Sequence, residues 1–139
     1  MSARTKARKR ALDILYNADV RQIPIAQSLR AEAERAAHEP AREASWLYAR
    51  EIVDGVIDHS EEIDALIARL AKGWTLARMP LVDRAILRIG VWEILHNDGV
   101  PDGVAIAEAV EAATVLSTDD SAGFINGLLA SVVESRATA

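Results

Sequence analysis

The sequence predicts an all-α protein. Apolar residues recur at spacings of three and four along most of the chain, which is the period of one helix face. Alternation of apolar and polar residues, which marks a half-buried strand, occurs nowhere at useful length. With 139 residues the chain is long enough to bury a core without covalent staples. We therefore expect a compact bundle of about seven helices in two packed subdomains.

The first three helices follow from apolar stripes and two prolines. The first helix runs from the N-terminal segment to about Asp19, and its stripe consists of Ala11, Ile14, Leu15 and Ala18. Pro24 fits the first turn of a second helix, where its missing N–H is not needed, and Pro40 marks that helix's end. The stripe of the third helix consists of Trp46, Leu47, Ala49, Ile52, Val53, Val56 and Ile57.

Caps, glycines and prolines separate the remaining helices. Ser60 is expected to cap a fourth helix, and Gly73 to end it. Segment 83–95 is apolar around its whole circumference, so we expect it to be the central buried helix. Pro101 precedes a sixth helix, and the polar turn 117–121 precedes the last.

The chain is expected to form one domain, 1–139. It contains no internal repeat, low-complexity tract or long linker. The most punctuated position lies at His59 and Ser60, so we expect an N-terminal subdomain of about 1–59 and a C-terminal subdomain of about 60–139.

Charge is distributed unevenly. The first ten residues contain no acid and five cations, which are Arg4, Lys6, Arg8, Lys9 and Arg10. The whole chain has 16 Lys+Arg and 21 Asp+Glu, so residues 11–139 hold 11 cations against 21 acids, a net charge of −10. A basic segment on an acidic body is typical of a protein that meets nucleic acid or an anionic membrane. A solvated terminus that maintains solubility is an equally open interpretation.

Composition argues against several classes of protein. The absence of cysteine excludes disulfides, a thiol nucleophile and thiolate metal sites. Asp13, Asn17 and Asp19 interrupt the region where a secretory signal would be apolar. No stretch approaches the ~20 apolar residues of a transmembrane helix. We therefore expect a soluble cytoplasmic protein that does not bind a membrane.

The sequence offers little for catalysis. His38, His59 and His96 are far apart and lack the H-E-x-x-H spacing of a zinc site, so each is expected to be structural or solvated. The chain has no phosphate-binding glycine loop and no G-x-S-x-G turn. Glu61 and Glu62 are explained by the positive end of a helix. We expect no enzyme, no cofactor and no bound metal.

Binding of single-stranded RNA has more support, because cations hold its backbone and aromatic rings stack on its bases. At about 100° per residue, Tyr16 falls off the apolar stripe of the first helix and near Lys9. Phe124, the only phenylalanine, lies at the edge of the last helix's stripe, beside Asp120. Both rings are candidates for base stacking, and completion of the core remains the alternative.

Several separated motifs point to a known family. They are WTLARMPLVDRAILRI at 74–89, VAIAEAVE at 104–111, Asp120-Ser121, and FINGLL at 124–129. Near the start, Ala7-Arg8 leads to Leu15-Tyr16, and in the third helix Gly55-Val56 follows Tyr48 and Ile52. In this order the motifs resemble the bacterial antitermination factors of the NusB family.

The resemblance implies a fold and a function. The fold is all-helical, with two subdomains. The function is binding of the boxA element in the leader of ribosomal RNA transcripts, together with a small-subunit ribosomal protein that is also NusE. The pair joins other Nus factors on RNA polymerase and supports transcription through terminators.

The resemblance also implies the residues of the site. Those assigned to RNA are Arg4, Lys6, Arg8, Lys9, Arg10, Tyr16, Asp120 and Phe124. Asp83 matches a position on the face that meets the ribosomal protein, and a basic partner would suit the acidic body.

Two positions depart from the family's pattern. Ala107 replaces a common Asn before Glu108, and Thr114 replaces a common Lys shortly after Glu111. A polar anchor and a cation are therefore missing from the sixth helix. We expect the basic segment to carry more of the affinity than usual.

Alternatives from other classes stay open. A helical adaptor that binds only protein would use the basic segment to dock on an acidic partner. A NusB-like domain of a ribosomal RNA methyltransferase is a second alternative, although the chain ends at Ala139 without room for the methyltransferase. A homodimer is also possible, because a self-associating helix face looks like a core stripe in sequence.

Overall fold

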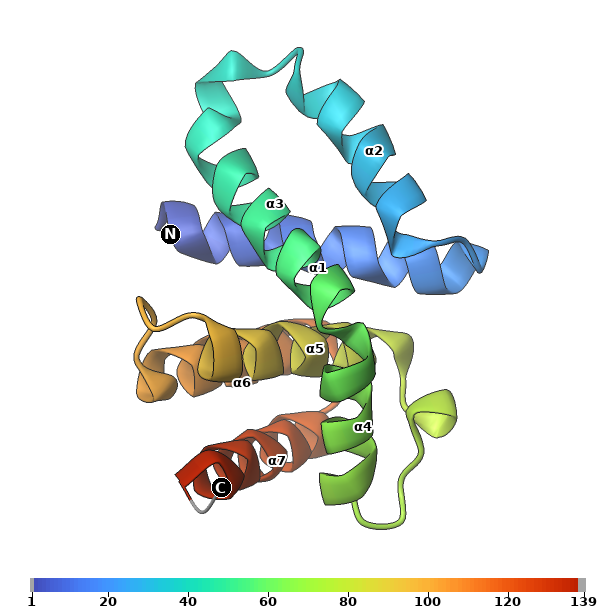
Figure 1. Ribbon diagram of the computed structural model, residues 1–139, viewed down its shortest axis with the longest axis vertical. Coiled ribbons are helices and arrows are strands. Elements are labelled where there is room, and N and C mark those ends of the chain that lie inside the picture. Colours follow the sequence, from blue (N-terminus) through green and yellow to red (C-terminus); the bar gives the residue numbers. More distant parts are fainter. Residues whose placement is uncertain (1, 138–139) are drawn as a thin grey trace.

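Seven α-helices carry most of residues 2–137, which are the residues that the computed structural model describes (Figure 1). They are α1 (Ala3–Arg21), α2 (Ile25–Ala36), α3 (Glu43–Asp58), α4 (Ser60–Leu70), α5 (Leu81–His96), α6 (Asp102–Leu116) and α7 (Asp119–Ala137). Two short 3-10 helices are η1 (Pro40–Arg42) and η2 (Leu76–Arg78). No strand occurs in this range, so the all-α prediction is confirmed.

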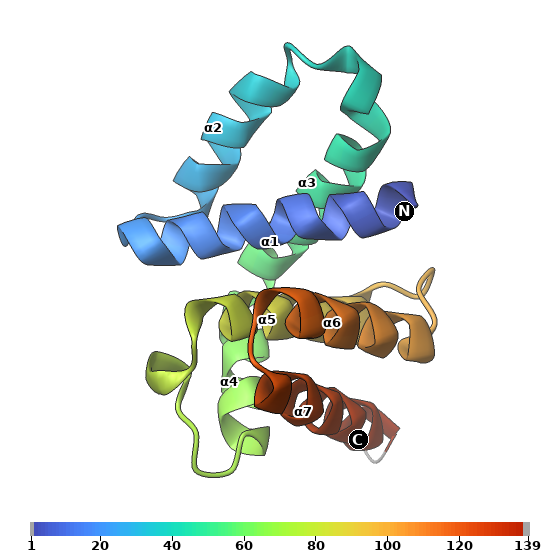
Figure 2. The same cartoon turned by 180° about the vertical axis from the view of Figure 1, so that it is seen from behind.

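Helix α5 is the centre of the packing. It contacts α1 and α3 as well as α4, α6 and α7. Figures 1 and 2 show α1 crossing the base of the arch formed by α2 and α3, with α4 to α7 below. Buried apolar residues of α1 and of α3 to α7 belong to one hydrophobic core, and α2 packs partly buried residues against it. The expected central helix is thus confirmed, whereas the division at residue 59 stays a prediction.

Several helix boundaries differ from those expected. Pro24 is the N-cap of α2 and not part of its first turn, because its ψ of 142° is extended. Helix α2 already ends at Ala36, and Pro40 opens η1. Ser60 is the first residue of α4 and not its cap, because His59 is both the C-cap of α3 and the N-cap of α4.

Two glycines hold positions that other residues would strain. Gly73 has a φ of +87°, in the left-handed region, and lies where the chain leaves α4, as expected. A Cβ on Gly55 would overlap the indole ring of Trp92, so α3 and α5 approach closely at this point. Within residues 2–137, no helix has the length and apolarity needed to cross a bilayer.

Candidate nucleic-acid interface

The cations of α1 fall into two groups. Arg4, Lys6 and Lys9 are exposed, whereas Arg8 and Arg10 are each only 9% exposed. The helical period explains the difference, because Arg8 lies one turn before the core residue Leu12, and Arg10 one turn before Ile14. Lys9 shares the opposite, solvent-facing stripe with Asp13 and Tyr16.

Arg8 forms a buried ion pair with Glu93 of α5. Its Nε donates to both carboxylate oxygens at 3.0 Å, and Nη2 lies 3.0 Å from Oε2. Glu93 is 1% exposed and also accepts a 2.5 Å hydrogen bond from the Tyr48 hydroxyl. Burial alone would lower the pKa of Arg8, but the hydrogen bond and charge of Glu93 outweigh it and raise that pKa. Burial, followed by the bond to Glu93, raises the pKa of Tyr48.

Arg10 is also used inside the protein. Its Nη1 donates to Ser45 Oγ at 3.2 Å and to the Arg42 carbonyl at 3.4 Å. Its Nη2 lies 3.2 Å from a Glu32 carboxylate oxygen. The structure therefore differs from the expectation that Arg8 and Arg10 meet RNA, because both guanidinium groups are bound by acids of other helices.

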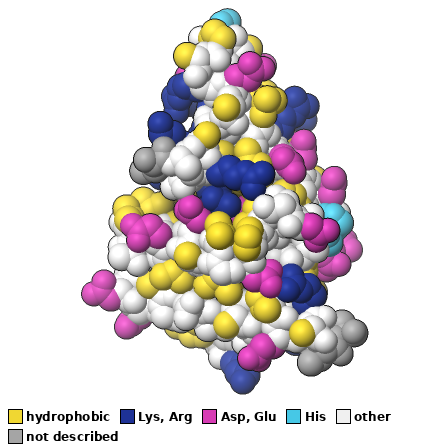
Figure 3. Space-filling model, turned by 90° about the vertical axis from the view of Figure 1, so that its left-hand side faces the viewer, with side chains coloured by type: hydrophobic (Ala, Val, Ile, Leu, Met, Phe, Trp, Pro, Cys, Tyr) yellow, Lys and Arg dark blue, Asp and Glu magenta, His cyan; other side chains and the backbone are white. Residues whose placement is uncertain are grey.

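The other three cations are available to a ligand. The Arg4 guanidinium lies 4.5 Å from the centroid of the Tyr48 ring. Among residues 2–137, neither Arg4 nor Lys6 has an acidic partner. Lys9 Nζ lies 2.8 Å from Asp13, but both side chains are about half exposed, so the pair is weak. On the side of the molecule that Figure 3 draws, several Lys and Arg side chains gather near the middle.

Three aromatic rings reach the surface. Tyr16 is 41% exposed, which confirms that it lies off the core stripe. Phe124 is half-buried, and its ring lies 6.1 Å from that of Trp74 at a tilt of 47°. Trp74 is 52% exposed in the connection before η2. Trp74 is not among the site residues predicted from the sequence, although a large aromatic ring in a helix break, directly after Gly73, is a usable signal.

Two hollows lie beside Lys9 and the three exposed or half-buried rings. One, of about 420 Å³, is lined by Lys9, Leu12, Asp13, Tyr16, Pro80, Leu81, Val82 and Leu116. The other, of about 310 Å³, is lined by Trp74, Met79, Pro80, Asp83, Thr118, Asp120, Ser121 and Phe124. Pro80 borders both, so they form one surface, which we call the α1–α7 face. Asp120 lies on it in the first turn of α7, where the helix dipole stabilises a carboxylate.

Asp83 lies beneath this face. It is 3% exposed, and its two oxygens accept hydrogen bonds from Ser117 Oγ at 2.6 Å and Ser121 Oγ at 2.7 Å. The expectation that Asp83 meets a protein partner directly therefore does not fit the structure. The carboxylate instead ties the start of α5 to the turn between α6 and α7, where Thr118 Oγ1 also accepts from the Ser121 N–H.

The departures from the family's pattern lie on the surface of α6. Ala107 and Thr114 are both exposed. The Thr114 hydroxyl donates to the Val110 carbonyl of its own helix at 2.9 Å. Of the described residues, the group with metal-ligating geometry is His59, Glu62 and His96, which shares no residue with the α1–α7 face.

Residues 5–134 match the model of the NusB family. The Leifsonia xyli protein named "Transcription antitermination protein NusB" is 78% identical over 136 residues, which cover 98% of this chain and 94% of that protein. The protein of the same name from Clavibacter sepedonicus is 62% identical over 137 residues, covering 99% of this chain and 100% of the relative.

Solved structures agree with the sequence relatives. NusB from T. maritima superposes with a TM-score of 0.82 at 29% identity, covering 96% of this chain and 92% of that one. A chain from a crystal structure of antitermination factors NusB and NusE in complex with dsRNA has a TM-score of 0.81 at 25% identity, covering 97% and 98%. The chain therefore belongs to the NusB family of transcription antitermination proteins, which are not enzymes.

Proposed function

We propose that the α1–α7 face binds single-stranded boxA RNA from the leader of ribosomal RNA transcripts, together with the ribosomal protein NusE. The complex would join other Nus factors on RNA polymerase in the cytoplasm. The observation that carries the proposal is a pair of adjoining hollows, the first lined by Lys9 and Tyr16 and the second by Trp74 and Phe124. A structural relative crystallised with NusE and RNA supports it.

The surface has the two elements that single-stranded RNA requires. Lys6 and Lys9 lie about 60° apart around an ordered helix and would bind phosphates of one strand, whereas Arg4 lies on another side of that helix, over the Tyr48 ring. Tyr16 and Phe124 offer ring surfaces for unstacked bases, and the tilted Trp74 ring widens the second platform. The acidic body, with its net charge of −10 over residues 11–139 (11 basic against 21 acidic), suits a basic ribosomal protein.

The salt dependence of binding tests how many cations take part. Three phosphate contacts predict that log affinity falls with log salt at a slope of roughly −2, at about 0.7 per contact on single strands. Five contacts, with Arg8 and Arg10 released from their acids, predict roughly −3.5. Fluorescence anisotropy of labelled boxA RNA at several salt concentrations measures the slope. A flat response would refute the electrostatic part of the proposal.

Single substitutions locate the contacts. Lys6→Ala should reduce the steepness of the slope by about 0.7. Arg50→Ala, which removes an exposed cation from α3, is the matched control and should leave the slope unchanged. Equal effects of the two variants would show that net charge, and not the α1–α7 face, governs binding.

The aromatic platform has its own test. Phe124→Ala and Trp74→Ala should each weaken boxA binding by about 1–3 kcal/mol if bases stack there. Leu47→Ala removes an exposed apolar side chain of α3 and serves as the control. If a folded Phe124→Ala variant binds boxA RNA with unchanged affinity, the Phe124 ring stabilises the fold and does not stack on a base.

Asp120 gives a test of opposite sign. A carboxylate repels phosphate, so Asp120→Asn should strengthen RNA binding. The neighbouring Asp119 does not line the hollow, which makes Asp119→Asn the control. Unchanged or weaker binding of Asp120→Asn in a gel-shift titration counts against placing RNA beside this residue.

The form of the RNA and the partner are tested together. The relative's complex contains dsRNA, so the titration should compare single-stranded boxA RNA with its duplex, each with and without NusE. The proposal expects the single strand to bind more tightly and NusE to increase its affinity. Binding of NusE without any binding of boxA RNA would favour the protein-only adaptor. Sizing with and without RNA would show whether a homodimer hides the face.

A further inference from the structure

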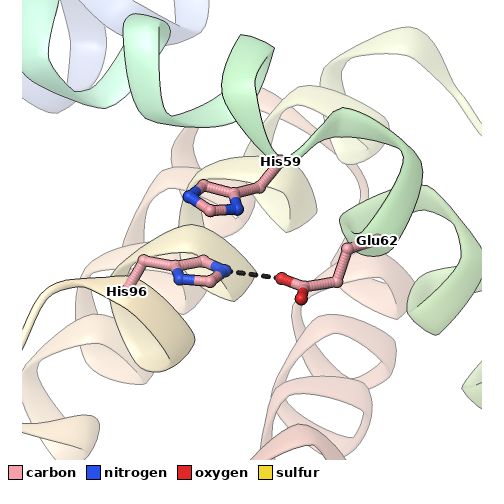
Figure 4. Close-up of side chains that lie close together, drawn as sticks. All are labelled: His59, Glu62 and His96. Atoms are coloured by element: carbon pink, nitrogen blue, oxygen red, sulfur yellow. Dashed lines mark hydrogen bonds and ion pairs between the residues drawn. The ribbon is translucent and has the colours of Figure 1, made fainter.

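Three side chains with metal-ligating atoms meet where α3, α4 and α5 come together (Figure 4). His59 lies between α3 and α4, Glu62 in the first turn of α4, and His96 at the end of α5. One ligand atom from each residue lies within 4.8 Å of the other two. The Nε2 atom of His96 is 2.5 Å from Glu62 Oε1, and the two imidazole rings stack with centroids 3.6 Å apart.

The backbone that carries the two histidines is fixed by packing. Gly55 lies one helical turn before His59, and Trp92 one turn before His96. Glycine is needed at position 55 because a Cβ there would overlap the Trp92 indole, which is 5% exposed. The close approach of α3 and α5 therefore holds the two imidazoles together on an ordered support.

The surroundings of the cluster favour a cation. The cleft beside the histidines is lined by the carboxylates of Glu51, Asp54 and Asp58. Arg50 also lines it, but this guanidinium lies 3.7 Å from the Asp54 carboxylate. The charge of the cleft is thus negative, which raises the local concentration of cations.

We propose that His59, Glu62 and His96 bind one divalent transition-metal cation, for which Zn²⁺ is the best match. Two imidazole nitrogens and one carboxylate oxygen form a frequent set of three protein ligands for Zn²⁺, with water as the fourth ligand. Mg²⁺ and Ca²⁺ prefer oxygen ligands alone, so two imidazoles select against them. The set uses two of the three histidines in the chain.

Metal binding requires a small rearrangement. Zinc bonds to nitrogen and oxygen are about 2.0–2.2 Å long, which places tetrahedral ligand atoms about 3.4 Å apart. His96 Nε2 and Glu62 Oε1, which lie 2.5 Å apart, must therefore separate to admit the ion. The two ring planes are inclined by only 12°, so their in-plane lone pairs lie in nearly parallel planes, and the imidazoles must turn until both lone pairs point at the ion. All three side chains reach solvent, so these rotations disturb no core packing. Bound metal would then link the α3–α4 junction to the end of α5.

The test is a titration of the metal-free full-length chain with ZnCl₂, measured by competition with a chromogenic chelator. We expect one Zn²⁺ per chain and a thermal midpoint that rises with Zn²⁺ concentration, because the folded state alone assembles the site. Substitution of Co²⁺ should give visible absorption bands from a site with nitrogen and oxygen ligands. MgCl₂ should change neither readout.

Variants separate this site from adventitious binding. His59→Ala, His96→Ala and Glu62→Gln should each weaken Zn²⁺ binding by more than about tenfold, since even groups that only orient a ligand contribute that much. His38→Ala removes the one histidine outside the cluster and should leave binding unchanged. Glu62→Gln keeps the size of an exposed side chain, so it remains informative even if a histidine variant folds poorly.

The proposal is overturned if the unaltered chain binds no Zn²⁺ under these conditions. It is equally overturned if Glu62→Gln retains full affinity, or if His38→Ala loses binding as His96→Ala does. Affinity for boxA RNA is expected to be the same in all four variants, so this result and the RNA result are independent.

Discussion

Replacement of Glu93 by Gln tests the buried ion pair that fixes α1. The substitution keeps the size of the side chain and removes its charge. Arg8 then remains at 9% exposure with only Glu108 as an acidic neighbour, at 3.4 Å. Tyr48 donates to a neutral amide oxygen in place of a carboxylate.

The expected loss of stability in Glu93→Gln follows from the burial of Arg8 and Glu93. Removing one member of a buried ion pair leaves an uncompensated charge and costs about 3–5 kcal/mol. Glu108 still compensates part of the Arg8 charge, and its side chain is 25% exposed, so we expect a value near the lower end. Glu93→Gln should therefore lower the free energy of unfolding by about 3 kcal/mol.

Urea unfolding followed by tryptophan fluorescence measures this change, provided that the dependence of unfolding free energy on urea is the same in both proteins. Lys9→Met is the matched control, because it breaks an exposed ion pair of the same helix and should cost about 0–1 kcal/mol. The double variant Arg8→Met/Glu93→Leu should recover much of the loss, since it leaves no buried charge. A loss for Glu93→Gln no larger than that of the control would refute the reasoning.

Four further substitutions test other parts of the fold. The raised pKa of Tyr48 means that the unfolded chain ionises first, near pH 10, so stability is retained below about pH 10 and lost as the pH rises through the raised value. Tyr48→Phe should flatten this alkaline loss in urea midpoints, and an unchanged pH profile would contradict it. Gly55→Ala forces a methyl group into Trp92 and should destabilise by about 1–3 kcal/mol or more. In Gly127→Ala the added methyl group meets no atom within 4 Å, so this variant should be more stable by about 0.5–1 kcal/mol. Similar thermal midpoints for Gly55→Ala and Gly127→Ala would refute the close approach of α3 and α5. Asp83→Asn removes a charged acceptor from two hydroxyl donors and should cost about 1–3 kcal/mol in the same urea assay, whereas a surface-like change below about 0.5 kcal/mol would show that the carboxylate is not needed.

The helical period is what made the fold predictable. Stripes of apolar residues place every α-helix, and the apolar circumference of 83–95 identifies α5 as the central helix. Boundaries were less predictable, because Pro24 and Ser60 suit several neighbouring positions at a helix start. The exposure of Tyr16 also follows from its angle on the helix.

Pairings between distant helices were not predictable from spacing. Glu93 is the one charged residue in the stretch 89–95, and only the fold shows that Arg8 binds it. Similarly, His59 and His96 lack any zinc-site spacing, yet the contact of α3 with α5 stacks their rings. One sequence signal does indicate a buried ion pair, namely a charged residue on the buried stripe of a helix. Arg8 is such a residue.

The buried arginines change how the basic segment is to be understood. A frayed terminus would have to lose conformational freedom on binding RNA, which lowers affinity. Here α1 begins at Ala3, where Ser2 Oγ accepts from the Thr5 N–H, and the Thr5 hydroxyl donates to Glu108 of α6 at 2.8 Å. Together with the Arg8 pair, these bonds fix the helix before any ligand arrives. Arg8 and Arg10 are thus bound to acids, whereas Arg4, Lys6 and Lys9 are exposed on a helix that is already ordered, so the proposed RNA site would lose little conformational freedom at α1 on binding.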